Sequence, residues 1–142
     1  MRPAANRGTA SRTAFEARPG DNSVAMGVRV LVVDDHAGFR AHARRLLECE
    51  GYRVVGEAGD CASALVAARE LEPELALVDV HLPDADGFEL ASRLGSLEAP
   101  PAVVLTSSRD GAELEPCVSA SGARGFVAKA ELSREAIEEL LA

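Results

Sequence analysis

An apolar run that ends on two acids, Val28-Arg29-Val30-Leu31-Val32-Val33-Asp34-Asp35, introduces a pattern that recurs along the chain. Three later apolar runs each precede one polar residue: 75–78 before Asp79, 102–105 before Thr106, and 125–128 before Lys129. Continuous apolar runs of this length are typical of parallel strands buried on both faces of a sheet. In an open parallel sheet, ligands bind outside the carboxyl ends of the strands. The sequence therefore predicts that these polar residues meet in one pocket.

Length and composition indicate one globular domain. The chain has 142 residues, of which 47% are hydrophobic and 27% charged, and this length can bury a core. No apolar stretch approaches the ~20 residues that a membrane span requires, so we expect a cytoplasmic protein without membrane contact. The three cysteines (Cys49, Cys61 and Cys117) are odd in number and lack the spacing of a zinc site. We interpret them as small hydrophobic residues in a reducing cytoplasm, without disulfides.

Charge divides the chain into two parts. Residues 1–27 carry four basic and two acidic side chains, which leaves 11 basic and 21 acidic side chains in residues 28–142. The first part has no strand or helix period, so we interpret it as a disordered tail. It also lacks the apolar core of a secretory signal. The acidic second part offers no basic surface for nucleic acid, and we expect no direct nucleic-acid binding.

From residue 28 onward, strand and helix patterns alternate. The predicted strands are 28–33, 53–58, 75–79, 102–106 and 125–128. The predicted helices are 37–49, 61–71, 87–95, a fourth that starts late with Pro116 in its first turn, and 132–141. Asp60 and Ser133 are predicted N-caps of two of these helices. Five strands alternating with five helices predict an α/β fold with a parallel sheet. A long loop is expected between Thr106 and the fourth helix.

The polar residues at the strand ends suggest phosphoryl chemistry. Three clustered carboxylates repel one another unless a cation holds them together, and Mg²⁺ prefers such oxygen ligands. With a metal bound, a carboxylate oxygen of Asp79 can act as a nucleophile towards a phosphoryl group. Lys129 and Thr106 can then meet the new charge. Lys129 is the only lysine among 15 basic side chains, and a compact ammonium suits a point contact to an oxyanion.

These residues belong to a dispersed motif in four parts. The parts are Val32-Val33-Asp34-Asp35-His36, Leu77-Val78-Asp79-Val80-His81-Leu82-Pro83-Asp84-Ala85-Asp86-Gly87, Leu105-Thr106-Ser107-Ser108 and Gly125-Phe126-Val127-Ala128-Lys129. With them, residues 28–142 resemble the receiver domain of bacterial two-component response regulators. The resemblance implies a flavodoxin-like (βα)5 fold, a doubly wound parallel five-stranded sheet with strand order 2-1-3-4-5.

The resemblance also implies a role for each site residue. Asp79 is the expected phosphoacceptor, and the expected donor is a sensor histidine kinase or a phosphotransfer protein. The implied Mg²⁺ ligands are Asp35, Asp79, the backbone carbonyl of His81 and, through water, Asp34. Thr106 and Phe126 are the implied switch residues, of which Thr106 moves towards the phosphoryl group and Phe126 rotates inward. Together with Lys129, they are expected to pass the change to a protein-binding face.

The motif most resembles receivers of LuxR-type regulators, because Ala130 stands where most receivers have proline and the acids are followed by His36. The sequence reaches Ala142 at the end of the last predicted helix without a linker, so we expect a stand-alone receiver, or one cut from a longer protein, that is not an enzyme. It is expected to signal through an unidentified downstream protein, with a phosphorylation-dependent homodimer as one form.

Two alternative functions compete with this prediction. One is an unphosphorylated pseudo-receiver that only binds partners, whose signature would be loss of the aspartate, the lysine or the acidic pair. The other is a haloacid-dehalogenase-type phosphatase, which requires a second aspartate two residues after the nucleophile. His81 occupies that place after Asp79, which disfavours the phosphatase.

Overall fold

The computed structural model describes residues 27–108 and 115–142 of the chain. The expected disordered tail, apart from Gly27, lies outside the described residues. Most of the loop expected after Thr106 also lies outside them, because only Ser107 and Ser108 are described before the gap.

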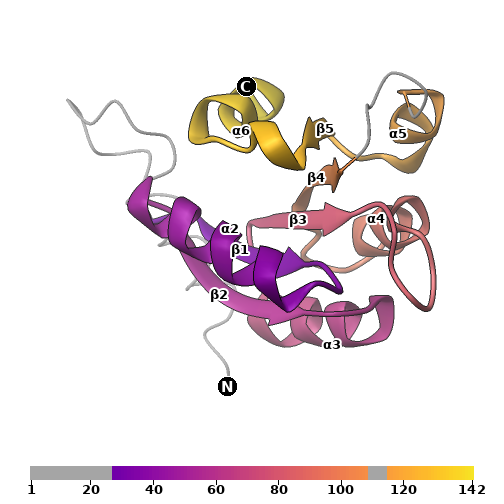
Figure 1. The fold of residues 1–142 in the computed structure, drawn as a ribbon. Coiled ribbons are helices and arrows are strands. Elements are labelled where there is room, and N and C mark those ends of the chain that lie inside the picture. The colour runs from indigo at the N-terminus through magenta and orange to yellow at the C-terminus, as the bar shows by residue number, and fades with distance from the viewer. Residues whose placement is uncertain (1–26, 109–114) are drawn as a thin grey trace.

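Five parallel strands form one sheet, as the sequence predicted. They are β1 (Arg29–Val33), β2 (Arg53–Ala58), β3 (Leu75–Asp79), β4 (Ala102–Ser107) and β5 (Gly125–Ala128). Their order is β2-β1-β3-β4-β5, and every neighbouring pair is parallel. The chain crosses from β2 over β1 to β3, so the strand order reverses at β1 and β3 (Figure 1). In such folds the crevice at this reversal is where ligands bind.

Helices cover both faces of the sheet (Figure 1). They are α2 (Ala37–Cys49), α3 (Cys61–Leu71), α4 (Gly87–Gly95), α5 (Glu115–Ser121) and α6 (Arg134–Leu141), with a 3₁₀ turn at Lys129–Glu131. Buried side chains of α3, α4 and α5 form one core with one face of the sheet. Those of α2 and α6 form a second core with the other face. Successive residues of β1 alternate between the two cores, since Leu31 and Val33 join the first while Val30 and Val32 join the second, as the pleat of a strand requires.

Local signals set most of the element boundaries. The side chain of Asp60 caps α3 by accepting the Ser63 N–H at 2.7 Å, and Pro116 lies in the first turn of α5. Both were predicted. The last helix was predicted to begin at residue 132, which is wrong by two residues. It begins at Arg134 because Ser133 is its N-cap, whose Oγ accepts the Ala136 N–H at 3.1 Å.

The cysteines form no disulfide with one another, as the sequence predicted, and all three are free thiols. Cys61 is buried at the start of α3, whereas Cys49 and Cys117 are exposed. Both lie on the outward sides of helices, where a small side chain is tolerated. No helix of the described residues has the length and apolar character needed to cross a membrane.

Candidate functional site

The predicted site residues lie at one edge of the sheet. Asp34 directly follows β1, Asp79 ends β3, and Lys129 directly follows β5. Asp79 is paired in register with Thr106 of β4, and Ser107 with Ala128, the residue before Lys129. The carboxyl ends of four strands therefore place these side chains next to one another, although they lie as many as 95 residues apart in sequence.

Lys129 forms ion pairs with two of the carboxylates. Its Nζ lies 2.6 Å from Asp34 Oδ2 and 3.4 Å from Asp79 Oδ2. The ammonium also lies 4.6 Å from the centre of the Phe39 ring, within the range of a cation–π contact. Only 16% of the Lys129 side chain is exposed, and Asp34 is fully buried. A single positive charge thus holds two buried acids together.

This packing shifts the ionisation of both partners. Burial raises the pKa of Asp79, and the negative charge of Asp34 raises it further, although the His81 N–H and Lys129 act in the opposite direction. Burial by itself lowers the pKa of Lys129. The hydrogen bond to Asp34 and the charges of Asp79 and Asp34 outweigh it, so the pKa of Lys129 is raised. The lysine therefore stays charged, while Asp79 is an unusually basic carboxylate.

The segment after Asp79 is fixed to the sheet and to the next helix. The His81 N–H donates to Asp79 Oδ1 at 3.2 Å. The Val80 N–H donates to the Thr106 carbonyl at 2.9 Å, and the Gly87 N–H donates to the Val80 carbonyl at 2.7 Å. An isolated antiparallel bridge joins His81 to Asp86. The loop 80–86 is thus a closed turn that begins next to Asp79 and returns to the backbone of Asp79 and Val80 at Gly87.

Asp84 ties the middle of this loop to α3. Its Oδ1 accepts the Cys61 N–H at 2.8 Å and its Oδ2 accepts the Ala62 N–H at 3.0 Å. These are free N–H groups of the first helical turn, which a carboxylate satisfies well. The two bonds, which we call the Asp84 clasp, connect the loop beside Asp79 to a helix 23 residues earlier in the chain.

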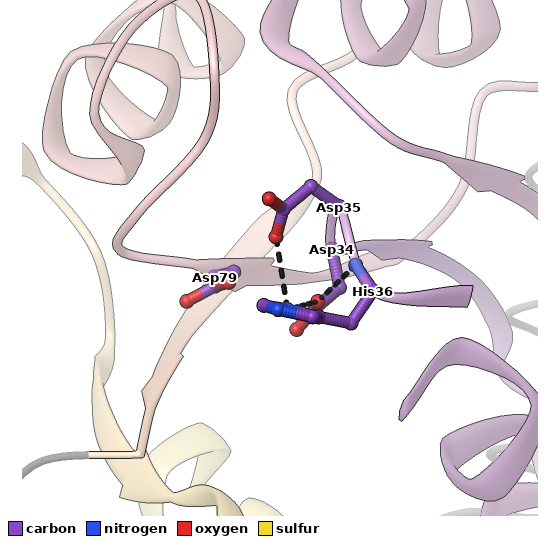
Figure 2. Close-up of side chains that lie close together, drawn as sticks. All are labelled: Asp34, Asp35, His36 and Asp79. Atoms are coloured by element: carbon purple, nitrogen blue, oxygen red, sulfur yellow. Dashed lines mark hydrogen bonds and ion pairs between the residues drawn. The ribbon is translucent and has the colours of Figure 1, made fainter. Parts of the chain in front are cut away.

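Four side chains converge at the ends of β1 and β3 (Figure 2). Asp34, Asp35, His36 and Asp79 each offer a ligand atom, and these atoms all lie within 4.8 Å of one another. The carboxylates form an oxygen-rich set that suits a hard divalent cation. Asp35 is partly exposed, with 38% of its side chain accessible, whereas Asp34 and Asp79 are buried. The residues present therefore fit the Mg²⁺ that the sequence predicted.

The two predicted switch residues lie beside the site. Thr106 is buried in β4, directly across from Asp79. Phe126 is half-buried in β5, pairs with Leu105 in register, and packs against the core that α3, α4 and α5 share with the sheet. Their rearrangement on phosphorylation stays a prediction.

The comparisons with known proteins identify the family. A model of the response regulator receiver domain matches residues 30–142. The chain belongs to this family. It is 41% identical over 113 residues to a protein of Pseudomonas aeruginosa named as a transcriptional regulator. The match covers 80% of this chain and 53% of that protein. The chain spans about half the length of the curated relatives it matches first.

Solved receiver structures share the fold. The receiver domain of NarL from Mycobacterium tuberculosis is 34% identical, with a TM-score of 0.72, and the match covers 82% of this chain and 98% of that one. A LuxR-family two-component response regulator from Aurantimonas sp. SI85-9A1 is 32% identical, with a TM-score of 0.73, and the match covers 81% and 85%. The predicted resemblance to receivers of LuxR-type regulators is confirmed, as is the flavodoxin-like fold.

Four contributors to the site were not foreseen from the sequence. The His36 imidazole faces the carboxylates, Phe39 lies under the lysine, Asp84 reaches α3, and Gly87 lies against the backbone of Asp79. His36, Asp84 and Gly87 stand in the sequence motif, but only Gly87 hinted at its contact, since glycine is the residue that permits a close approach of the backbone.

Proposed function

We propose that this receiver domain is phosphorylatable, and that Asp79 accepts a phosphoryl group from a histidine kinase or a phosphotransfer protein. One observation carries the proposal: the ammonium of Lys129 lies between the carboxylates of Asp34 and Asp79, at 2.6 and 3.4 Å. A lysine used only as surface charge has no reason to occupy a buried position over a strand end. A lysine used to bind phosphoryl oxygens needs to be at this place.

The chemistry follows from the side chains present. An Asp79 oxygen attacks the phosphorus atom, and the bond from phosphorus to the donor's imidazole nitrogen breaks, with the electron pair left on that nitrogen. Mg²⁺, held by Asp35, Asp79, the His81 backbone carbonyl and, through water, Asp34, would neutralise charge on the phosphoryl oxygens. The raised pKa of Asp79 is consistent with a strong nucleophile.

Lys129 and Thr106 respond to the new charge. In the phosphorylated state Lys129 turns its ammonium from Asp79 to a phosphoryl oxygen, and the Thr106 hydroxyl donates to another. Phe126 then fills the space beside β4. A shift of this kind requires that these groups contact the phosphoryl oxygens in one state and not in the other. The distances to Asp79 and the register of β3 with β4 support both contacts.

The proposed output is a protein–protein contact, and the domain is not an enzyme acting on a separate substrate. The excess of acidic over basic side chains in residues 28–142, 21 against 11, argues against direct nucleic-acid binding by this domain. The proposed place of action is the cytoplasm, where histidine kinases present their phosphoryl groups. The relatives are transcriptional regulators by name and are about twice as long as the matched region. We therefore propose, as separate points, that the domain acts alone and that it signals to a downstream protein. The protein that it contacts can also be a second copy of this chain, in a phosphorylation-dependent homodimer.

The test is phosphorylation by a small-molecule donor. The protein is incubated with acetyl phosphate and Mg²⁺, and its intact mass is measured. We expect one added phosphoryl group on the parent protein and none on Asp79→Asn. The matched control is Asp86→Asn, which changes the nearby acid that caps α4 into another good N-cap residue. Equal labelling of the Asp79→Asn variant, or no labelling of the parent, would overturn the proposal.

A further inference from the structure

His36 occupies the N-cap position of α2, but its side chain does not cap the helix. It precedes α2, where its side chain makes no capping hydrogen bond, although Ser, Thr, Asp and Asn are strongly preferred at this position because their side chains do. Its side chain is 72% exposed and could extend into solvent. Instead, Nδ1 lies 3.1 Å from Asp35 Oδ1 and 3.3 Å from Asp34 Oδ1 (Figure 2). Helix capping therefore does not explain why histidine stands here.

The separation between His36 Nδ1 and Asp35 Oδ1 matches that between neighbouring ligands of one metal ion. In an octahedral complex with bonds of about 2.1 Å, adjacent ligand atoms lie about 3 Å apart. His36 Nδ1 and Asp35 Oδ1, 3.1 Å apart, are spaced in this way. Ligand atoms of Asp34 and Asp79 belong to the same group, all of whose members lie within 4.8 Å of one another. The chain thus places one nitrogen and one oxygen ligand of neighbouring residues side by side at the metal site.

We propose that His36 Nδ1 is a ligand of the metal site and gives it a preference for a transition-metal ion such as Mn²⁺ over Mg²⁺. The proposal rests on the metal site of the proposed function and adds a nitrogen donor to it. Mg²⁺ and Mn²⁺ both bind carboxylate, carbonyl and water oxygens, whereas imidazole suits first-row transition metals, the class to which Mn²⁺ belongs and Mg²⁺ does not. With oxygen ligands alone, the two ions compete on similar terms. One nitrogen among them favours Mn²⁺ selectively.

The competing explanation is an ion pair between a protonated His36 and the two acids. The two explanations predict opposite changes in Mn²⁺ affinity when His36 is removed. A histidine that only pairs with the carboxylates competes with every cation, so its removal strengthens the binding of Mg²⁺ and Mn²⁺ alike. A histidine that ligates the metal strengthens Mn²⁺ binding, so its removal weakens Mn²⁺ and leaves Mg²⁺ nearly unchanged.

The experiment is a calorimetric titration of untagged protein with Mg²⁺ and, separately, with Mn²⁺. The variant is His36→Ser, which keeps a favoured N-cap residue and is too short to reach the metal. The control is His42→Ser, which removes another exposed imidazole of α2 that contacts Phe39 and lies outside the cluster. We expect His36→Ser to lower Mn²⁺ affinity by about tenfold, the lower end of the effect seen when groups around a metal site are changed. Mg²⁺ affinity should stay the same, and His42→Ser should alter neither.

A spectroscopic measurement tests nitrogen ligation directly. Electron spin echo modulation of bound Mn²⁺ should show a coordinated ¹⁴N in the parent protein and lose it in His36→Ser. Absence of this signal in the parent, or a parallel change in both affinities, overturns the assignment of His36. If the parent binds Mg²⁺ and is phosphorylated in that case, the proposed function still stands. If the parent protein binds neither Mg²⁺ nor Mn²⁺, the proposed metal site is wrong as well.

Discussion

Gly87 packs against the backbone of Asp79, with no room for a side chain between them. A Cβ built on Gly87 would lie 2.4 Å from the Asp79 carbonyl oxygen and 2.9 Å from Val80 Cα. The first residue of α4 thus touches the strand end that carries the proposed phosphoacceptor. Since the atoms on the other side are backbone, they cannot turn away as a flexible side chain would.

Gly87→Ala should therefore displace the helix start from β3. Overpacking of this kind costs about 1–3 kcal/mol, so we expect a lower Tm and slower labelling by acetyl phosphate. The matched control is Gly95→Ala at the other end of α4, where a Cβ would meet nothing within 4 Å. That variant should be neutral or slightly stabilising, because alanine is the better helix former. Equal effects of the two substitutions would mean that the contact at Asp79 is not tight.

Asp79→Asn should stabilise the metal-free protein at neutral pH. Burial and the Asp34 charge raise the pKa of Asp79 above its ordinary value of 3.8. The folded state therefore binds a proton more tightly than the unfolded state, and stability falls as pH rises from the ordinary to the raised value. The variant should unfold at a higher Tm than the parent at pH 7, with the gap closing below pH 3.8.

Thermal unfolding in chelator-treated buffer across this pH range checks the trend, and Glu139→Gln controls for the loss of one exposed acid. A gap that widens as the pH falls would contradict the raised pKa.

Lys129→Gln should leave two buried carboxylates without their counter-charge. Removing one partner of a buried ion pair typically costs about 3–5 kcal/mol, so metal-free protein should unfold at a clearly lower Tm. Added Mg²⁺ should recover more stability in this variant than in the parent, since the cation replaces the missing charge. Lys129→Arg keeps the charge but not the compact shape of the ammonium. This variant should still accept a phosphoryl group, but phosphorylation should no longer change its binding to a partner. Scanning calorimetry with and without Mg²⁺ decides the first point, with Arg124→Gln as an exposed control. No loss of Tm in Lys129→Gln would rule out a structural role for this ion pair.

Asp84→Asn should weaken the Asp84 clasp in a pH-dependent way. The Cys61 N–H is the main cause that lowers the pKa of Asp84, with help from Ala62, while partial desolvation works in the opposite direction. A lowered pKa means that the carboxylate stabilises the fold above its ordinary pKa, and that this stability is lost as pH falls through the lowered value. The variant should have a Tm a few degrees lower than the parent at neutral pH, and the two should converge in strong acid.

Amide exchange should also become faster at Cys61 and Ala62 in this variant. The control is Glu70→Gln, which changes an exposed acid near the other end of α3. Unchanged exchange at both amides would show that the clasp does not hold the helix start.

The sequence predicted the layers of this fold because the layers depend on local periodicity. Runs such as residues 75–78 are apolar throughout, as is typical of strands buried on both faces, and Asp60 and Pro116 marked helix starts through their own backbone preferences. The edge at which Asp79, Thr106 and Lys129 meet followed from the direction of parallel strands. These inferences need no knowledge of side-chain conformation.

Local sequence patterns could not predict contacts between side chains that lie far apart in the sequence. Phe39 reads as one apolar residue of a helix face, yet it lies below the Lys129 ammonium. Asp84 reads as a turn residue, and its two acceptor bonds to α3 depend on how a loop folds over the sheet. The motif located His36, but the direction of its imidazole is a rotamer choice, set by nearby charge and not by sequence period.

The Asp84 clasp has one more consequence, which concerns thiol chemistry. The residue whose N–H it holds most closely is Cys61, whose side chain is buried beneath the same helix turn, whereas Cys49 and Cys117 are exposed. Burial also raises the pKa of the Cys61 thiol, which slows its reaction further. An alkylating reagent should therefore modify two cysteines quickly and the third only when the turn opens. The rate of that third modification reports how often the loop beside Asp79 releases α3.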